Sequence, residues 1–313
     1  MEYRRLGDSG LKVSEIGLGC NNFGMRIDQD GTNAVIAAAI DQGVTFMDTA
    51  DVYGGQGKSE EMMGVALKGR RNEVVLATKF ASPMGKGPDK QGGSRRYVME
   101  AVEASLKRLQ TDYIDLYQMH RPDPDTPIEE TLSALDDLVT QGKIRYIGNS
   151  NFTGWMIADA DWTSRNEHLS RFVSAQNNYS LLERRVEHEV TPACDRFGLG
   201  MLPYFPLASG LLTGKYARGE APPEGTRLAN FGPRAAAALN DNNFDKLDRL
   251  THWAQERGHT LLELAFAWLL GHKVVSSVIA GATKPEQVAN TVAAGAWRPG
   301  DDVLAEVDAI APR

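Results

Sequence analysis

The chain has 313 residues, of which 42% are hydrophobic and 24% charged, and its formal net charge is -7. This is the composition of a soluble globular protein, and with no basic excess to neutralise phosphates it excludes a nucleic acid or a membrane surface as the expected partner. The two cysteines, Cys20 and Cys194, form no disulfide framework, and the start MEYRRLGDSGLKV lacks an apolar segment of signal-peptide length, so we expect a cytoplasmic protein.

The predicted elements begin with a hairpin and continue as an alternation of strands and helices. The runs EYRRLG and LKVSEIG flank the turn sequence DSG, which predicts a small N-terminal β-hairpin. Apolar, β-branched segments then predict eight strands, at residues 16–20, 44–48, 74–79, 113–120, 144–150, 172–176, 200–204 and 275–280. The segments between them predict helices at residues 32–43, 58–69, 96–109, 128–142, 155–165, 185–198, 260–271 and 285–295.

Eight strand–helix units favour an α/β fold with a closed parallel sheet, a (β/α)8 TIM barrel capped by the N-terminal hairpin. No Pro-, Gly- or Ser-rich linker divides the chain, so we expect a single domain over residues 1–313. The stretch from Ala208 to Phe244 is rich in Gly, Pro and Ala and predicts a long irregular loop after strand seven, over the active-site face. The longest apolar run, residues 261–271, contains Glu263 and is too short to span a bilayer.

The segment DTADVYGGQGKS, residues 48–59, resembles a phosphate-binding loop only at its end. Gly57, Lys58 and Ser59 fit that motif, but its first glycine would fall at Val52. The glycines therefore predict a turn that leads into a helix.

The ends of the predicted strands carry polar side chains that a barrel would bring together. Strand two ends in Asp48, strand three in Lys79 and strand four in His120, and Tyr53 follows Asp48 by five residues. Because catalytic groups in such barrels lie at the C-terminal ends of the strands, we expect these four side chains to meet at one rim. Each alone could instead be a strand-end cap, a solvated strand end, a buried histidine or a surface aromatic.

Together the four residue types suit proton transfer to a carbonyl oxygen. A nearby ammonium stabilises a phenolate and lowers the pKa of a tyrosine, and a carboxylate keeps that ammonium charged and in place. Tyrosine then serves as general acid and base, while a neutral histidine orients the carbonyl by a hydrogen bond.

The species that attacks the carbonyl carbon must come from a cofactor. No activated serine motif, CxxC or HExxH site is present, and the six histidines do not cluster like metal ligands. A nicotinamide would supply hydride. The dinucleotide fingerprint GxGxxG is absent, because Gly17 and Gly19 are followed by Cys20, Asn21 and Asn22. Nicotinamide binding must therefore use the barrel rim.

These residues resemble the aldo-keto reductase superfamily, in the bacterial branch near potassium-channel β subunits and general stress reductases. The matching segments are GVTFMDTADVYG, ATKF, YQMHRPD, IGNSNF, AQNNYSLLER, PYFPLASGLLTGKY and IAGATKPEQV, in the family's order over essentially the whole chain. The resemblance implies a barrel that reduces aldehydes or ketones reversibly with NADP(H). It implies Tyr53 as proton donor, Lys79 and Asp48 as the pair that tunes it, and His120 as the residue that orients the carbonyl.

The same resemblance implies a set of cofactor-binding residues spread over the rim. Ser150, Asn151 and Gln176 would hold the nicotinamide carboxamide, and Tyr204 would stack on the ring. The other expected cofactor contacts are Gly19, Cys20, Asn21, Asp48, Phe205, Pro206, Leu207, Ser209, Gly210, Leu211, Lys215, Gly281, Thr283, Lys284, Gln287 and Asn290.

The chain departs from the family pattern near its C-terminus. Ala280 stands where the pattern has proline, and Thr291 stands where it has asparagine, with Asn290 just before it. Lys284 still offers a positive charge for a 2′-phosphate, so we expect NADP(H) in preference to NAD(H).

Two other functions remain open. The protein could hold the cofactor as a redox-sensing regulator with little turnover, or Lys79 could form a Schiff base as in an aldolase. Asn21, Asn22, Phe23, Met84 and the long loop are expected to shape the substrate pocket. The sequence predicts a small-molecule carbonyl or alcohol substrate but neither its identity nor a choice between monomer and homo-oligomer.

Overall fold

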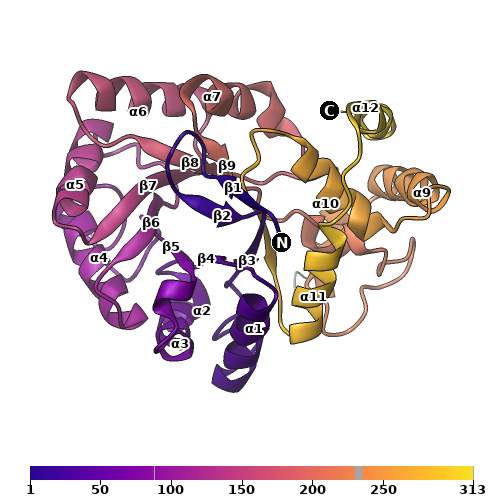
Figure 1. Cartoon of the computed structure of the whole chain (residues 1–313), viewed down its shortest axis with the longest axis horizontal. Helices are drawn as coiled ribbons and strands as arrows, with labels where there is room; N and C mark the ends of the chain where they lie inside the picture. Colours follow the sequence, from indigo (N-terminus) through magenta and orange to yellow (C-terminus); the bar gives the residue numbers. More distant parts are fainter. Residues whose placement is uncertain (88, 230–234, 313) are drawn as a thin grey trace.

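The computed structural model describes residues 1–87, 89–229 and 235–312, and its core is a parallel sheet ringed by helices (Figure 1). The strands pair side by side in the order β10, β3, β4, β5, β6, β7, β8, β9. Their bounds are β3 (Ile16–Gly19), β4 (Phe46–Asp48), β5 (Val75–Phe80), β6 (Ile114–Met119), β7 (Ile144–Ser150), β8 (Phe172–Gln176), β9 (Gly200–Met201) and β10 (Val278–Gly281).

Backbone hydrogen bonds also join the two ends of this strand order. The amide of Ser276 donates to the carbonyl of Met201 over 2.9 Å, and the amide of Ile279 donates to that of Pro203 over 3.0 Å. Every pairing in the sheet is parallel. The predicted (β/α)8 TIM barrel is confirmed.

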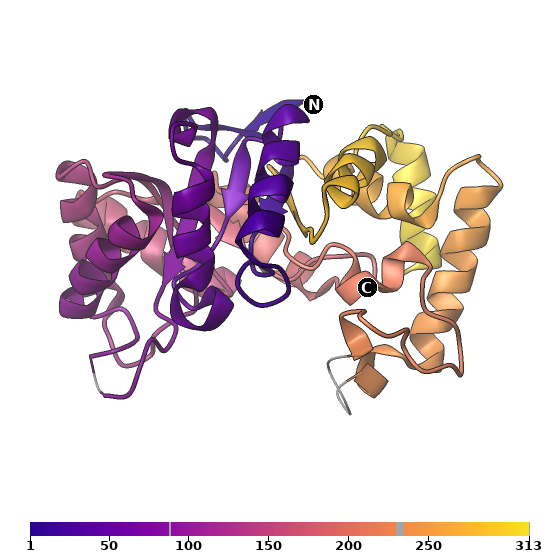
Figure 2. The ribbon, with the colours of Figure 1, turned by 90° about the horizontal axis from the view of Figure 1, so that it is seen from below.

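The N-terminal hairpin is also confirmed, with β1 (Tyr3–Arg5) antiparallel to β2 (Lys12–Ser14). It covers the N-terminal end of the barrel, since the Asp8 amide donates to the Gly198 carbonyl and the Gly7 amide to the Ser276 hydroxyl, just ahead of β9 and β10. Figure 2 shows this hairpin at the top and α8 (Ala235–Ala238), in the segment after β9, at the bottom. The C-terminal rim of the strands is therefore left to the loops.

Helices follow the strands, and several of them begin at a polar side chain that caps the first turn. The Asp28 side chain accepts from the Gly31 amide at the start of α1, Ser94 accepts from the Tyr97 amide at the start of α4, and Thr260 forms a capping box with Glu263. The helices outside the barrel are α1 (Gln29–Asp41), α3 (Lys58–Ala66), α4 (Arg95–Leu109), α5 (Ile128–Thr140), α6 (Gly154–Asn166), α7 (Val190–Phe197), α9 (Asp241–Gln255), α10 (Leu261–Gly271), α11 (Pro285–Ala294) and α12 (Asp301–Ile310). Shorter turns are α2 (Tyr53–Gln56), η1 (Arg71–Glu73), η2 (Arg185–His188) and η3 (Ala208–Thr213).

Several predicted bounds were wrong for identifiable reasons. The strand expected at 200–204 ends at Met201, ahead of Pro203, which has no N–H to donate. The helix expected at 185–198 is divided at Glu189 into η2 and α7. Pro192 is tolerated in the first turn of α7, but it would interrupt the interior of a single helix that began at residue 185. The irregular loop expected from Ala208 to Phe244 contains the short helices η3 and α8 and the start of α9. Residues 230–234 of this segment lie outside the part of the chain that the structure describes.

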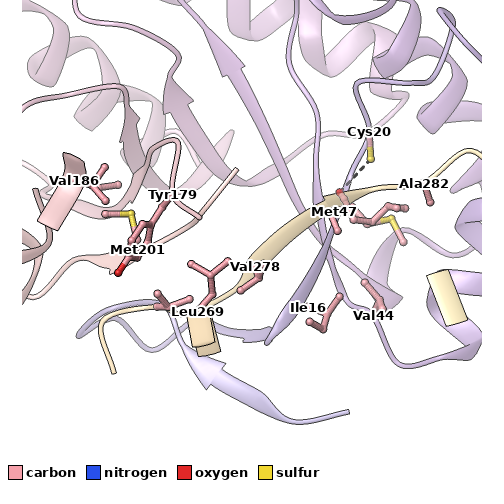
Figure 3. Close-up of a cluster of buried hydrophobic side chains, with 14 of the residues drawn as sticks. Ile16, Cys20, Val44, Met47, Tyr179, Val186, Met201, Leu269, Val278 and Ala282 are labelled. Atoms are coloured by element: carbon pink, nitrogen blue, oxygen red, sulfur yellow. Dashed lines mark hydrogen bonds between the residues drawn. The ribbon is translucent and has the colours of Figure 1, made fainter. Parts of the chain in front are cut away.

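The core lies between the barrel and its helices. Figure 3 shows part of it, and Ile16 of β3, Met47 of β4, Val278 of β10 and Leu269 of α10 are buried members of this one cluster. Strands buried on both faces explain the continuous apolar runs of the sequence. No helix among the described residues is long and apolar enough to cross a membrane.

Candidate active site

A buried ion pair marks the C-terminal rim of the barrel. Asp48 ends β4 and Lys79 lies in the neighbouring β5, and the Lys79 Nζ is 2.6 Å from Asp48 Oδ2 and 2.8 Å from the Thr49 carbonyl. The other carboxylate oxygen accepts from Gln118 Nε2 at 3.2 Å and Gln176 Nε2 at 2.8 Å. With Lys79 fully buried, these contacts fix both partners in one position.

Tyr53 and His120 complete the predicted group of four. The Lys79 Nζ lies 5.0 Å from the centre of the Tyr53 ring, and the Tyr53 and His120 rings meet edge to face at 5.6 Å. Tyr53 opens the short α2 turn, while His120 directly follows β6. The four side chains therefore come together as their strand-end positions predicted.

Burial sets the protonation of these groups. It raises the pKa of Tyr53, and Lys79 opposes this by its charge and a hydrogen bond without reversing it. The expected lowering of that pKa is therefore wrong in this structure, because desolvation and the Asp48 charge outweigh the ammonium. Burial, with Lys79 and Arg121, lowers the pKa of His120 to about 3. At neutral pH the rim thus holds a protonated tyrosine and a neutral imidazole.

The pKa of Lys79 is raised although its burial acts in the opposite direction. The charges of Asp48 and Tyr53 and the hydrogen bonds to them outweigh desolvation. A lysine held as an ammonium has no free electron pair with which to attack a carbonyl. This argues against the Schiff-base hypothesis.

The residues expected to hold the nicotinamide form a hydrogen-bonded arc beside His120. The Asn151 Nδ2 donates to the His120 carbonyl at 2.9 Å, and Tyr204 donates its hydroxyl to Asn151 Oδ1 at 2.8 Å. The Ser150 hydroxyl donates to the Gln176 carbonyl at 2.8 Å. Asn151 has a φ of 63°, a left-handed conformation that asparagine tolerates better than most residues.

A cavity of about 850 Å³ opens above this group. It is lined by Tyr53, Asp48 and His120 and by nearly all the expected cofactor residues: Gly19, Cys20, Asn21, Ser150, Asn151, Gln176, Tyr204, Phe205, Pro206, Leu207, Ser209, Gly210, Lys215, Gly281, Thr283, Lys284, Gln287 and Asn290. Leu211, Phe23 and Met84 lie outside this lining, and Leu211 and Phe23 are buried in the core. The structure thus brings all but one of the expected cofactor residues to one cavity.

Two cationic residues of the cavity were missed from the sequence. Arg26 follows β3, and its Nη2 donates to the Gly225 carbonyl at 2.6 Å; Arg227 lies over the Phe205 ring at 4.5 Å. Both belong to irregular segments, where sequence periodicity carries no signal. With Lys215 and Lys284 they make four cations around the cavity, none paired with a carboxylate among the described residues.

A buried carboxyl lies behind the site. Asp51 is 1% exposed, accepts from the Tyr97 hydroxyl at 3.3 Å, and has near it the ion pair of Glu60 with Arg108. Burial, and then the Glu60 charge, raise the pKa of Asp51 to about 7, against the opposing effect of Arg108.

We expect this group to make stability fall with rising pH. The unfolded chain releases the Asp51 proton near pH 4 and the folded chain only near pH 7, so the loss accumulates between these values. Asp51→Asn should stabilise the protein at pH 8 by at most about 4 kcal/mol and have little effect at pH 4. Denaturant unfolding at both pH values measures this, with the exposed Asp112→Asn as control. A pH-independent difference would contradict it.

Groups of three or more histidine, cysteine or acidic side chains able to hold a metal ion are absent from the part of the chain that the structure describes. Both cysteines are buried, and burial raises the pKa of each thiol.

The fold and the site define a class: a closed α/β barrel with a tyrosine, a lysine–aspartate pair and a histidine at the floor of a deep cavity. The chain belongs to the aldo/keto reductase family, whose sequence model matches residues 15–312. It is therefore an oxidoreductase-type protein of a family whose general activity is carbonyl reduction.

Three relatives align over more than nine tenths of this chain. A protein of Oryza sativa subsp. japonica named "Probable voltage-gated potassium channel subunit beta" is 40% identical over 301 residues, 94% of this chain and 91% of the relative. "Aldo-keto reductase YhdN" of Bacillus subtilis is 39% identical over 92% of this chain and 87% of its own length. "L-glyceraldehyde 3-phosphate reductase" of Escherichia coli K12 is 34% identical, with 94% and 87% covered.

Proposed function

We propose that this protein reduces aldehyde or ketone carbonyl groups to alcohols, reversibly, with NADP(H) as the hydride carrier and Tyr53 as the proton donor. The observation that carries the proposal is the close group of Tyr53, Lys79, Asp48 and His120 at the floor of a cavity that four cationic side chains line. Family membership supports the reaction class.

The cavity fits a phosphorylated dinucleotide. Lys284 is the N-cap residue of α11, so its ammonium and the positive end of this helix both favour an anion there. Gly210 has a φ of 97°, and a Cβ there would come within 2.6 Å of the Lys215 side chain, so the chain passes close beneath that cation. We expect Lys215 and Arg227 to contact the pyrophosphate and Lys284 to contact the 2′-phosphate.

The rim residues perform the proton transfer. A nicotinamide held in the cavity would supply the hydride. Tyr53 gives its proton to the carbonyl oxygen, and the adjacent Lys79 ammonium stabilises the phenolate that remains. Asp48 holds Lys79 in place, and the neutral His120 donates a hydrogen bond that aligns the oxygen. In the reverse direction the phenolate of Tyr53 accepts the proton of the alcohol.

A regulatory role is a second candidate because two relatives carry the name of a probable potassium-channel β subunit. Turnover distinguishes the two functions. We expect NADPH oxidation with at least one aldehyde or ketone in a panel that includes sugars. Tight NADPH binding without oxidation by any reactive aldehyde would favour the regulator.

We expect Lys284→Ala to weaken NADPH binding about tenfold or more and to leave NADH binding nearly unchanged. The reason is that a charge-assisted contact to the 2′-phosphate exists only for NADPH. Fluorescence titration with both cofactors measures the two dissociation constants, with the exposed Lys68→Ala as control. Equal weakening for both cofactors would remove Lys284 from the 2′-phosphate site.

A further inference from the structure

Ser82 lies buried beside the rim and has no part in the chemistry described so far. Its Oγ is 3.1 Å from Nδ1 of His120, the ring nitrogen on the protein side of the imidazole. Ser82 comes two residues after the end of β5, and His120 one residue after the end of β6. The two strands are neighbours, and the His120 amide donates to the Phe80 carbonyl at 2.9 Å, which ties the two segments together.

The backbone turns Ser82 toward the histidine through an unfavourable conformation. Ala81 has a φ of 81°, which residues with a Cβ rarely adopt and which tends to occur at functional sites. Two contacts hold this turn: the Gly92 amide donates to the Ala81 carbonyl at 3.2 Å, and the Tyr97 hydroxyl, whose one hydrogen is shared with Asp51, lies 3.3 Å from the Ser82 carbonyl.

The direction of the hydrogen bond follows from proton counting. A neutral imidazole carries one N–H, and a serine hydroxyl has one hydrogen to donate. If Nδ1 carried the proton, the buried Ser82 hydrogen would have no acceptor among the hydrogen bonds of the described residues, which is unfavourable. If Ser82 donates to Nδ1, its buried hydroxyl hydrogen has an acceptor and the ring proton lies on Nε2.

The other ring nitrogen, Nε2, then carries the proton that the proposed reaction needs. Nε2 has no hydrogen-bond partner among the described residues, and His120 lines the cavity. A protonated Nε2 can donate to a carbonyl oxygen there, whereas an unprotonated one would repel it.

We propose that Ser82 is a positioning residue that donates its hydroxyl hydrogen to Nδ1 of His120 and so fixes the tautomer with the proton on Nε2. The catalytic consequence rests on the proposed carbonyl reduction, but the tautomer itself does not. Ser82 acts through His120 and needs no contact with substrate.

The tautomer is tested by long-range proton–nitrogen correlation spectra of the uniformly nitrogen-15-labelled protein at pH 7. The six histidines are few enough to assign, and the His120→Gln spectrum identifies the His120 signals. We expect wild type to show His120 with Nε2 protonated and Nδ1 unprotonated. We expect Ser82→Ala to show a mixture of both tautomers and Ser82→Thr, which keeps the hydroxyl, to resemble wild type.

Kinetics test the consequence. We expect Ser82→Ala to lower kcat/KM for an aldehyde about tenfold while the NADPH dissociation constant stays unchanged, and Ser82→Thr to recover most of the loss. A wild-type His120 protonated on Nδ1, or an unaltered tautomer in Ser82→Ala, would overturn the proposal. A changed tautomer with unchanged kcat/KM would overturn its catalytic half.

These outcomes are separable from failure of the proposed function. A wild-type protein without any carbonyl reduction would refute that function and leave the spectra to decide the tautomer. If Ser82→Ala failed to fold, the wild-type and Ser82→Thr spectra would still show which nitrogen carries the proton.

Discussion

Tyr53→Phe is expected to lower kcat for carbonyl reduction by roughly 10²- to 10⁴-fold, the usual contribution of a positioned general acid. Phenylalanine keeps the ring that meets His120 edge to face and Lys79 at 5.0 Å, but it has no proton to give. The NADPH dissociation constant should change less than about twofold, because the lost hydroxyl serves the substrate oxygen. Steady-state rates and cofactor titration measure the two quantities.

A matched control and a pH profile sharpen this prediction. Tyr3→Phe removes a hydroxyl from the hairpin at the opposite end of the barrel, where it donates to the Gly43 carbonyl, and should leave kcat unchanged. Because the pKa of Tyr53 is raised and that of His120 is about 3, neither titrates near neutrality. The kcat/KM of reduction should stay level from about pH 5 to pH 9. Near-wild-type turnover in Tyr53→Phe would show that another group donates the proton.

Lys79→Met should lower the free energy of unfolding by about 3–5 kcal/mol and abolish most turnover. The substitution leaves the 3% exposed Asp48 without its cation, and an uncompensated buried charge is strongly destabilising. The amides of Gln118 and Gln176 remain as donors and limit the loss. Denaturant unfolding at neutral pH measures the change.

Two further variants distinguish this explanation from a simple packing loss. Lys79→Met combined with Asp48→Asn should regain at least half of the lost stability, because no charge then stays buried alone. Lys58→Met breaks an exposed ion pair with Glu61 and should cost less than about 1 kcal/mol. A double variant no more stable than Lys79→Met would mean that the carboxylate charge is not the cause.

The sequence alone was enough to predict that the site residues at the ends of the strands lie close together. Asp48 ends β4, Lys79 lies one residue before the end of β5 and His120 directly follows β6, so the closed barrel leaves them little freedom to lie apart. Their proximity could therefore be predicted, whereas their chemical roles stay predictions, as does a single domain over residues 1–313. The helices α9 and α12 were missed although Phe244, Leu247 and Leu250 of α9 follow a helical spacing that the sequence already contained.

Other parts depend on contacts that no local pattern records. Ser82 faces His120 only because Ala81 adopts a left-handed backbone, which its side chain does not favour. Arg26 and Arg227 are 201 positions apart in the sequence, and irregular segments bring both to the lining of the same cavity. The pKa of Tyr53 depends on a balance between burial and Lys79 that the residue types alone could not weigh.

The most direct test of the central claim follows the hydride. Reactive aldehydes are incubated with the protein and NADPH deuterated at the transferable position, and the alcohol is examined by mass spectrometry. The proposed function predicts an alcohol with one deuterium on its carbinol carbon, formed faster than with equally labelled NADH and almost absent with Tyr53→Phe. Tight NADPH binding with no labelled alcohol from any aldehyde would contradict it.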